Sequence, residues 1–248
     1  MYRLFCSLTA ASVLASNAFA GAMGSIMPSR DWTWVGSVSA GAAWAGAGET
    51  QTFYLTPDIE KTYVATKTTN ALASGEVFWG VQKALSSSWL GQLGLAAAAY
   101  DNTQLQGVIW DDADPEFDNY SYQYKISSAR IAIKSKLLLN KGYWVMPWVS
   151  ASIGAGFNHA NDYTNTPLIF EAITNPNFTN QIKTTFTYTL GAGIQKTLNN
   201  HWQIGVGYEF ADWGKSELGR AFDQSLNTGL TLNHLYTNGV LLNLTYVV

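Results

Sequence analysis

Apolar and polar side chains alternate along several stretches of this chain, each long enough to cross a lipid bilayer as a tilted strand. In the segment 32–45, Trp32, Trp34, Val38 and Trp44 fall on one face, opposite mostly small or hydroxyl-bearing residues. A period of two residues indicates a β-strand with two unlike faces. The tryptophans stand ten to twelve residues apart, which covers the roughly 25 Å between the aromatic girdles of an outer-membrane barrel.

The same alternation returns in the segments 183–197 and 201–213. Soluble β-sandwiches also alternate, but their strands average about five or six residues and seldom carry aromatic residues at both ends. The length of the pattern therefore favours a lipid-facing exterior. The predicted fold class is all-β, an eight-stranded antiparallel transmembrane β-barrel in which each strand pairs with the next, that is, an up-and-down meander.

We place the eight strands at 32–45, 70–83, 89–100, 120–138, 143–157, 183–197, 201–213 and 232–248. The connections alternate between short turns bearing Ser, Asn and Gly and long segments of about twenty residues. Short periplasmic turns and long outer loops are the expected asymmetry of an outer-membrane barrel. The placement thus predicts four long outer loops and two periplasmic termini.

Two features strain this placement. Asn238-Gly239, between apolar runs, is a hairpin signal, but a turn there would give nine strands, so we expect one long final strand. In the segment 120–138 the apolar face changes between the tyrosines of 120–124 and the isoleucines of 131–133. A bulge near Ser127-Ser128, or tyrosines standing above the membrane, would account for that change.

The first twenty residues have the organisation of a secretory signal peptide. Arg3 supplies a positive charge, residues 4–15 form an apolar stretch too short to span a bilayer, and Ala18 and Ala20 provide a small-x-small cleavage pattern. Cys6 is the only cysteine and precedes most of the apolar stretch, so we reject lipidation. The predicted division is a signal peptide, 1–20, and an outer-membrane β-barrel, 21–248.

Composition agrees with a membrane-embedded chain. Charged residues make up 12% of the sequence and aromatic residues 14%, and the charged share is about half that of a soluble domain. No stretch of about eighteen consecutive apolar residues is present, so no transmembrane helix is expected. Without Arg3 the balance is 13 basic against 17 acidic residues, 13 − 17 = −4, which argues against nucleic acid as a partner.

The C-terminal residues carry the most specific motif. Val240, Leu242, Leu244, Tyr246 and Val248 alternate up to the carboxyl end. This ending resembles the assembly signal of outer-membrane proteins, which usually closes with Phe or Trp. These five residues are therefore the candidate signal for the outer-membrane assembly machinery, with Val248 as a departure from the usual final residue.

Together with the mature start 21–24 and the stretch 205–214, this ending resembles the small OmpA/OmpX-like outer-membrane barrel superfamily, often called porin-family proteins. The likeness covers the mature chain as architecture. It implies an eight-stranded barrel of a Gram-negative cell surface, embedded in outer-membrane lipid. Members of the family serve as structural surface proteins, adhesins, host-interaction factors or narrow pores, so the resemblance does not choose a function.

Four charged residues are expected to meet in the lumen. Glu76, Arg130 and Glu209 face inward, each about nine or ten residues from a periplasmic turn, and Lys134 enters lower on the face of Arg130. Side chains fill the interior of an eight-stranded barrel, and a lone charge there would be strongly penalised. We therefore predict a paired network that plugs the lumen. Separate solvation of these charges by water, in a small passive pore or transporter, is the alternative.

The third outer loop contains an apolar run, 166–173, with Leu168, Ile169 and Phe170 at its centre. Exposed apolar patches often mark interaction sites. The run is the candidate contact with host or surface ligands. Packing of the run onto the barrel rim or the lipid headgroups is the alternative.

Catalysis has little support in the sequence. Barrel enzymes that act on lipid A or on peptides need a histidine paired with a serine or an acid. His159 is expected in an outer loop, His201 at the periplasmic edge and His234 on the last strand, so no two should be close. The prediction is that the protein is not an enzyme, and an outer-membrane enzyme acting on lipid A is the least favoured alternative.

No metal or cofactor is expected either. The acidic residues of 111–118 lack the spacing of a known calcium loop. The glycine pairs of 154–156, 191–193 and 205–207 should lie on the inward face, where they make room for larger neighbours. The predicted function is a structural or host-facing surface barrel with a side-chain-filled lumen.

Overall fold

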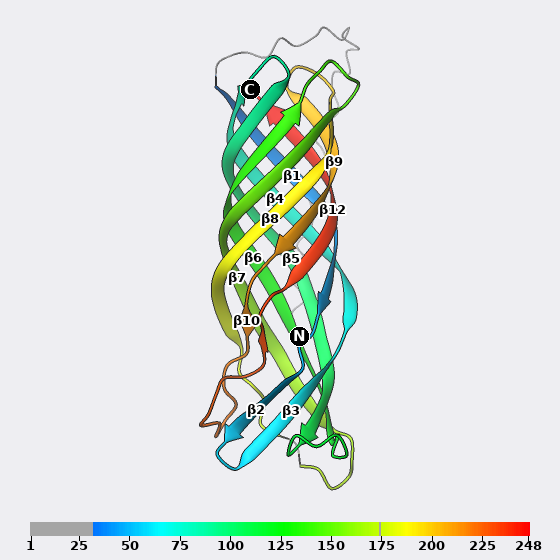
Figure 1. Cartoon of the computed structure of the whole chain (residues 1–248), viewed down its shortest axis with the longest axis vertical. Coiled ribbons are helices and arrows are strands. Elements are labelled where there is room, and N and C mark those ends of the chain that lie inside the picture. The colour runs from blue at the N-terminus through cyan, green and yellow to red at the C-terminus, as the bar shows by residue number, and fades with distance from the viewer. Residues whose placement is uncertain (1–31, 174) are drawn as a thin grey trace, which may run out of the picture.

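A computed structural model describes residues 32–248 except residue 174, and the predicted signal peptide with Ala18 and Ala20 lies outside these residues. The described part is a tall cylinder of strands (Figure 1). No helix in it is long and apolar enough to cross a membrane. The strands are β1 (Thr33–Ala47), β2 (Gln51–Thr56), β3 (Ile59–Thr66), β4 (Thr68–Ala84), β5 (Trp89–Asp111), β6 (Tyr120–Leu139), β7 (Met146–Pro167), β8 (Gln181–Thr197), β9 (Trp202–Asp212), β10 (Ser216–Glu217), β11 (Thr231–Leu232) and β12 (Tyr236–Val247).

Eight strands close into a ring. Antiparallel pairing runs in the order β1, β4, β5, β6, β7, β8, β9 and β12, and β12 returns to β1. The predicted eight-stranded up-and-down barrel is therefore confirmed. Asn238 and Gly239 lie inside β12, paired with Trp44 and Ala43, so the final strand is continuous as expected.

The outer face of the ring is apolar over the height of a bilayer. Trp34, Val38, Ile131, Ile133 and Leu242 all point outward with large exposed fractions. A closed sheet satisfies its backbone hydrogen bonds internally, which is the condition for crossing hydrocarbon, and the apolar belt identifies lipid as its surroundings. The chain is an outer-membrane β-barrel.

Several strands continue well beyond this belt. β5, β6 and β7 have 23, 20 and 22 residues, about twice the nine to eleven that a membrane requires. The β2–β3 hairpin prolongs the β1–β4 pair, because β3 pairs with the outer part of β5. The first predicted outer loop is present, but most of it is a β-hairpin that turns at residues 57–58. The other outer connections are 112–119, 168–180 and 213–235.

The apparent change of face in β6 has the second of its two predicted explanations: the tyrosines stand above the lipid-facing belt. Tyr120, Tyr122 and Tyr124 are buried inside the barrel, on the same face as Arg130. A register shift does lie beside Ser127-Ser128, but its extra residue belongs to β5, after Tyr100. A second shift lies around residue 162 in β7. The faces of β6 stay constant, and what changes is the chemistry of the barrel interior along its height.

A hydrophobic core fills the outer part of the barrel, above the lipid-facing belt. Its residues come from the extended strands, the β2–β3 hairpin and the 168–180 and 213–235 connections, and include Tyr63, Leu105, Ile109, Tyr122, Tyr163, Phe178, Trp213, Leu218, Leu230 and Leu235. The outward residues of β6 at this height are polar, among them Gln123 and Lys125. The barrel is therefore apolar outside and polar inside within the membrane, and the reverse above it.

Candidate functional site

Four charged side chains form a closed ring of contacts across the lumen. Arg130 Nη2 lies 3.1 Å from Glu76 Oε2 and 2.6 Å from Glu209 Oε1. Lys134 Nζ lies 3.0 Å from Glu209 Oε2 and also hydrogen-bonds Glu76 Oε1. Each cation thus bridges both carboxylates, and we call these four residues the ion-pair layer. The structure brings together all four residues that the sequence placed in the lumen.

Strand register explains how the layer forms. Glu76 on β4 and Arg130 on β6 both pair with Ala98 on the intervening β5, so a small side chain separates the two charged ones. Glu209 on β9 pairs with Gly191 and Gly239 on either side, and neither neighbour occupies the lumen. Long charged side chains therefore reach the barrel centre over rows of small residues.

Trp213 covers the outer side of the ion-pair layer. Its ring lies 4.5 Å from Arg130 Cζ and makes an edge contact with Tyr100, at 4.7 Å between ring centroids. The indole N–H donates to Thr237 Oγ1 at 2.9 Å, and Asn158 Nδ2 donates to the Trp213 carbonyl at 2.8 Å. The sequence analysis did not single out Trp213 as a lumen residue. The only hint in the sequence was the glycine that follows it, Gly214, which in the structure has a φ of 74° and turns the chain.

A small chamber lies on the inner side of the layer. Its lining includes Glu76, Lys134, Lys136, Trp148 and Asn243, and about 40 Å³ is open to the centre of a water molecule. Lys136 Nζ donates to Gln195 Oε1 at 2.5 Å and lies 4.4 Å from the Trp148 ring centroid. Lys136 faces inward like Arg130, yet the sequence analysis did not single it out.

Glycines make room for the Trp148 ring, as the sequence analysis predicted for the paired glycines. A Cβ on Gly207 would overlap that ring, and a Cβ on Gly193 would lie 2.6 Å from it. The indole therefore lies across β8 and β9 instead of projecting into open space. A Cβ would also be too close to its neighbours at Gly154 and Gly205, so these glycines serve packing of the barrel.

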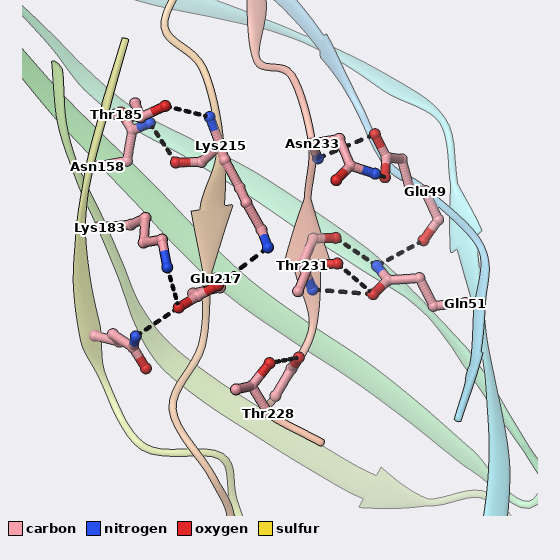
Figure 2. Close-up of polar contacts among 12 residues, drawn as sticks. Glu49, Gln51, Asn158, Lys183, Thr185, Lys215, Glu217, Thr228, Thr231 and Asn233 are labelled. Atoms are coloured by element: carbon pink, nitrogen blue, oxygen red, sulfur yellow. Dashed lines mark hydrogen bonds and ion pairs between the residues drawn. The ribbon is translucent and has the colours of Figure 1, made fainter. Parts of the chain in front are cut away.

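The connection between β9 and β12, residues 213–235, completes the wall of the outer barrel (Figure 2). On one side it meets β2: the Gln51 amide donates to the Thr231 carbonyl and accepts the Thr231 N–H at 3.0 Å. This side-chain amide imitates a pair of strand hydrogen bonds. Next to it, Glu49 accepts hydrogen bonds from the backbone N–H and side chain of Asn233, at 3.2 and 2.8 Å.

On its other side the same connection meets β8 through Glu217 (Figure 2). The carboxylate accepts hydrogen bonds from Gln181 Nε2 at 2.7 Å and Lys183 Nζ at 2.8 Å, and lies 3.3 Å from Lys215 Nζ. Burial alone would raise the pKa of the Glu217 carboxyl, but the two lysines outweigh burial and hold the pKa below its ordinary value.

The tips of the outer connections are linked to one another. Lys61 Nζ contacts Asp111 Oδ1 at 2.6 Å and Asn175 Oδ1 at 3.2 Å, which joins three connections at one side chain. The backbone N–H groups of Ser225 and Leu226 both donate to the Leu55 carbonyl at 3.0 Å. We call this assembly, residues 52–62, 111–119, 168–178 without 174, and 219–228, the crown.

The predicted partner segment lies in the crown. Leu168, Ile169 and Phe170 are exposed, and Phe170 is fully so. Residues 166 and 167 belong to β7 instead of the loop, so the exposed apolar run begins at Leu168. The Leu168 N–H donates to the Asn119 carbonyl at 2.7 Å, which ties the run to the neighbouring connection and not to the lipid-facing belt.

The histidines are placed partly as predicted. His201 lies at the periplasmic end, with Nδ1 2.9 Å from the Val247 carbonyl. His159 lies within β7 instead of an outer loop, because that strand is longer than predicted. His234 lies two residues before β12 and not within it as predicted, and its Nδ1 lies 2.9 Å from Asp212 Oδ2.

The His234–Asp212 pair is the histidine–acid contact that the sequence analysis did not foresee. Among the described residues, no hydroxyl is hydrogen-bonded to the His234 ring, so the pair lacks an activated nucleophile of the Ser–His–Asp type. In the same part of the chain no three His, Cys, Asp or Glu residues are grouped to hold a metal ion.

The candidate assembly signal forms the outward face of β12. Val240, Leu242, Leu244, Tyr246 and Val248 are all exposed to the lipid side. Tyr246 packs on Trp202, with 4.9 Å between the ring centroids, and the Val248 N–H donates to the Trp34 carbonyl at 3.0 Å. The segment therefore closes the ring at the periplasmic end.

No protein-family model and no curated sequence matches this chain. Among solved structures, Neisserial surface protein A is 9% identical, with a TM-score of 0.47, covering 86% of this chain and 96% of that chain. The attachment invasion locus protein Ail of Yersinia pestis, in complex with a heparin analogue, is 12% identical at a TM-score of 0.34, covering 87% and 99%. The outer membrane protein AlkL is 10% identical at 0.38, covering 94% and 96%. These identities are too low to assign a function.

Proposed function

We propose that this protein is a structural or partner-contacting surface barrel whose lumen is closed to solutes. One observation carries the proposal: the 213–235 connection folds onto the outer end of the barrel and contributes Trp213, Leu218, Leu230 and Leu235 to its buried core. An open pore would leave this end lined by polar side chains and water. Here the outer end is packed like the interior of a soluble domain.

A second closure supports the proposal. The ion-pair layer lies beneath the core, and the side chains of Arg130 and Glu76 are almost inaccessible to solvent. Opening a path through the lumen would require breaking contacts of two buried cations with two buried carboxylates. A buried charge left without its partner is penalised by about 3–5 kcal/mol, so we expect the ion-pair layer to stay closed.

The small-pore alternative has less support. The chamber below the layer offers about 40 Å³ to water centres, and one water requires about 10–15 Å³. The chamber thus holds a few waters and no larger solute. The lipid A enzyme alternative would require a nucleophile at the His234–Asp212 pair, which the described residues do not supply.

The proposal extends to family and origin. An eight-stranded meander with short periplasmic turns supports membership of the OmpA/OmpX-like class. Export through a cleavable signal peptide, insertion by the outer-membrane assembly machinery and a Gram-negative source belong to the same proposal. The pattern of residues 1–20, the alternating C-terminal residues and the family resemblance of the sequence support them.

Planar-bilayer recording of the refolded protein tests the closed lumen. The wild type should show no steady conductance. Replacing residues 216–231 with a short Gly-Ser linker opens the outer closure only, and Arg130→Ala with Lys134→Ala opens the inner closure only, so each alone should stay nearly silent. The combined variant should conduct. A large steady conductance of the wild type, unchanged by Arg130→Ala, would contradict the proposal and favour the pore.

Lys125→Ala provides the matched control. Lys125 is an exposed cation on the outer face of the same strand, paired with exposed Asp162 at 3.1 Å. Its removal changes the charge as Arg130→Ala does but leaves the lumen untouched. It should therefore not alter the conductance of either the wild type or the combined variant.

A further inference from the structure

Exposed apolar side chains collect at the crown, outside the reach of the lipid-facing belt. Phe117, Leu168, Phe170, Ile173 and Phe222 come from three different connections, and Phe170, Ile173 and Phe222 have 100%, 84% and 79% of their surfaces exposed. Strands β5 to β7 raise these tips well above the membrane belt. Large apolar side chains held in water at one end of a molecule mark an interaction surface.

The crown is also acidic. Six exposed carboxylates lie within it: Asp58, Asp112, Glu116, Asp118, Glu171 and Asp223. The exposed cation of the crown is Arg220, because Lys61 is buried and paired with Asp111. The whole chain has 17 acidic and 14 basic residues, so the six-to-one ratio is a local excess.

This charge excludes several occupants of the apolar surface. A second copy of the chain would bring a like-charged crown into contact, and an anionic lipid or polysaccharide surface would be repelled. Like charges placed against each other at an interface cost several kcal/mol. A cationic partner gains from the same field, both in encounter rate and in specificity.

The crown is organised to bind without first folding. Lys61 joins the tips of three connections, and the Leu55 carbonyl accepts two backbone hydrogen bonds from the fourth. The Tyr120 hydroxyl also donates to the Ile173 carbonyl at 2.9 Å. Loops already ordered in the free protein lose less entropy on association.

We infer that the crown binds a cationic amphipathic protein segment, in which lysines or arginines alternate with apolar side chains. The apolar residues of that segment would pack on Phe170, Ile173 and Phe222, and its cations would lie against the surrounding carboxylates. The inference rests on the proposed function, since it names the chemistry of the partner that a closed surface barrel would contact.

Binding of two synthetic peptides tests the inference, with the protein in nanodiscs of zwitterionic lipid. One peptide alternates Lys and Leu, the other Glu and Leu, and empty nanodiscs measure binding to lipid. The Lys-Leu peptide should bind at least about tenfold more tightly than the Glu-Leu peptide, and its affinity should fall with added salt. Equal affinities of the two peptides, or no binding of either, would overturn the inference.

Two sets of variants separate the charge from the apolar surface. Asp112→Asn with Glu116→Gln and Asp118→Asn should weaken Lys-Leu binding about tenfold and flatten its salt dependence. Phe170→Ser with Ile173→Ser and Phe222→Ser should weaken binding by a similar factor and leave the salt dependence intact. Asp101→Asn, an exposed acid of β5 outside the crown, is the matched control and should change neither.

Failure of this inference is distinguishable from failure of the proposed function. Silent bilayer recordings with no preference for the Lys-Leu peptide would overturn the partner chemistry alone. Steady wild-type conductance would overturn the closed lumen, whatever the crown binds. A loss of binding in Asp101→Asn as large as in the crown variants would mean that the peptide senses only net charge, which also overturns the inference.

Discussion

The ring of Trp213 stacks over the guanidinium group of Arg130, with 4.5 Å between Cζ and the ring centroid. Trp213 is the first residue after β9, so the connection that closes the outer barrel begins on the ion-pair layer. Trp213 also makes a T-shaped contact with Tyr100, which belongs to the outer core. The two closures of the lumen are therefore joined through one side chain.

Trp213→Ala should destabilise the folded barrel by about 3–5 kcal/mol, because it leaves a cavity in the outer core and removes the cation–π contact with Arg130. Urea unfolding in lipid vesicles, followed by circular dichroism, measures the change. Trp144→Ala is the control: Trp144 is largely exposed in a periplasmic turn and contacts Lys196 Nζ by cation–π geometry, at 4.2 Å from the ring centroid. Its removal should lower the free energy of unfolding by about 0.5–1 kcal/mol. Equal effects of the two substitutions would show that Trp213 does not link the closures.

Arg130→Ala should lower the free energy of unfolding by about 3–5 kcal/mol. The substitution leaves two carboxylates, Glu76 and Glu209, in the lumen with Lys134 as their single shared cation. Adding Glu209→Gln to Arg130→Ala should cost less than the sum of the two single changes, because the second change removes an unpaired charge. The same urea titrations give this coupling. Strictly additive costs would mean that water solvates these charges separately, as the pore alternative requires.

The ion-pair layer was predictable because it depends only on strand faces and approximate height. Glu76, Arg130 and Glu209 fall on inward positions at similar distances from the periplasmic turns, and an error of one or two residues does not move a long side chain out of reach. Because side chains alternate with a period of two, the face on which a residue lies does not depend on where the strand is taken to begin or end. The candidate residues of the lumen could therefore be found from the sequence alone.

The outer half was not predictable by the same rule. The assumption that apolar residues face lipid made Tyr120, Tyr122 and Tyr124 look like outward residues, whereas above the membrane water lies outside and the core inside. Tyrosines above the membrane were one of two explanations left open, because alternation alone does not mark where the membrane ends. The role of Trp213 was not predicted for a related reason. It depends on a turn at Gly214 that directs the connection into the barrel, and the alternation of apolar and polar residues does not predict the path of a connection.

Acid should weaken the attachment of the 213–235 connection to β8. The folded-state pKa of Glu217 lies below its ordinary value of 4.5, so the charged form stabilises the folded state. That contribution is fully present above the ordinary pKa and is lost as the pH falls through the lower folded-state pKa. The melting temperature of the wild type should exceed that of Glu217→Gln at pH 7, and the difference should shrink towards zero below pH 4.5.

Asp162→Asn is the control for the acid effect. Asp162 also pairs with a lysine, but both partners are exposed, and exposed pairs contribute little. The melting temperature of this variant should follow the wild type across the pH range. A wild-type advantage over Glu217→Gln that stays constant down to pH 3 would mean that the carboxylate acts through packing instead of charge.

Deleting residues 244–248 should prevent insertion, for a reason that the ring geometry makes explicit. Leu244 to Val247 pair with Val35 to Val38 on β1, and Leu244 to Tyr246 pair with Trp202 to Ile204 on β9. Without them the ring opens at its periplasmic end and exposes unpaired backbone groups to hydrocarbon. Membrane fractionation should find the truncated chain outside the membrane, and its insertion at normal amounts would contradict this expectation.

Two single substitutions separate ring closure from recognition by the assembly machinery. Tyr246→Thr keeps the backbone pairing of β12 but removes the aromatic ring on Trp202. If the assembly machinery reads this side chain, the variant should refold in detergent like the wild type yet insert more slowly in cells. Val248→Phe supplies the usual aromatic ending at an exposed position, so it should insert at least as well as the wild type. Parallel losses of refolding and insertion in Tyr246→Thr would assign the residue to barrel stability alone, because a recognition role predicts a defect only where the assembly machinery acts.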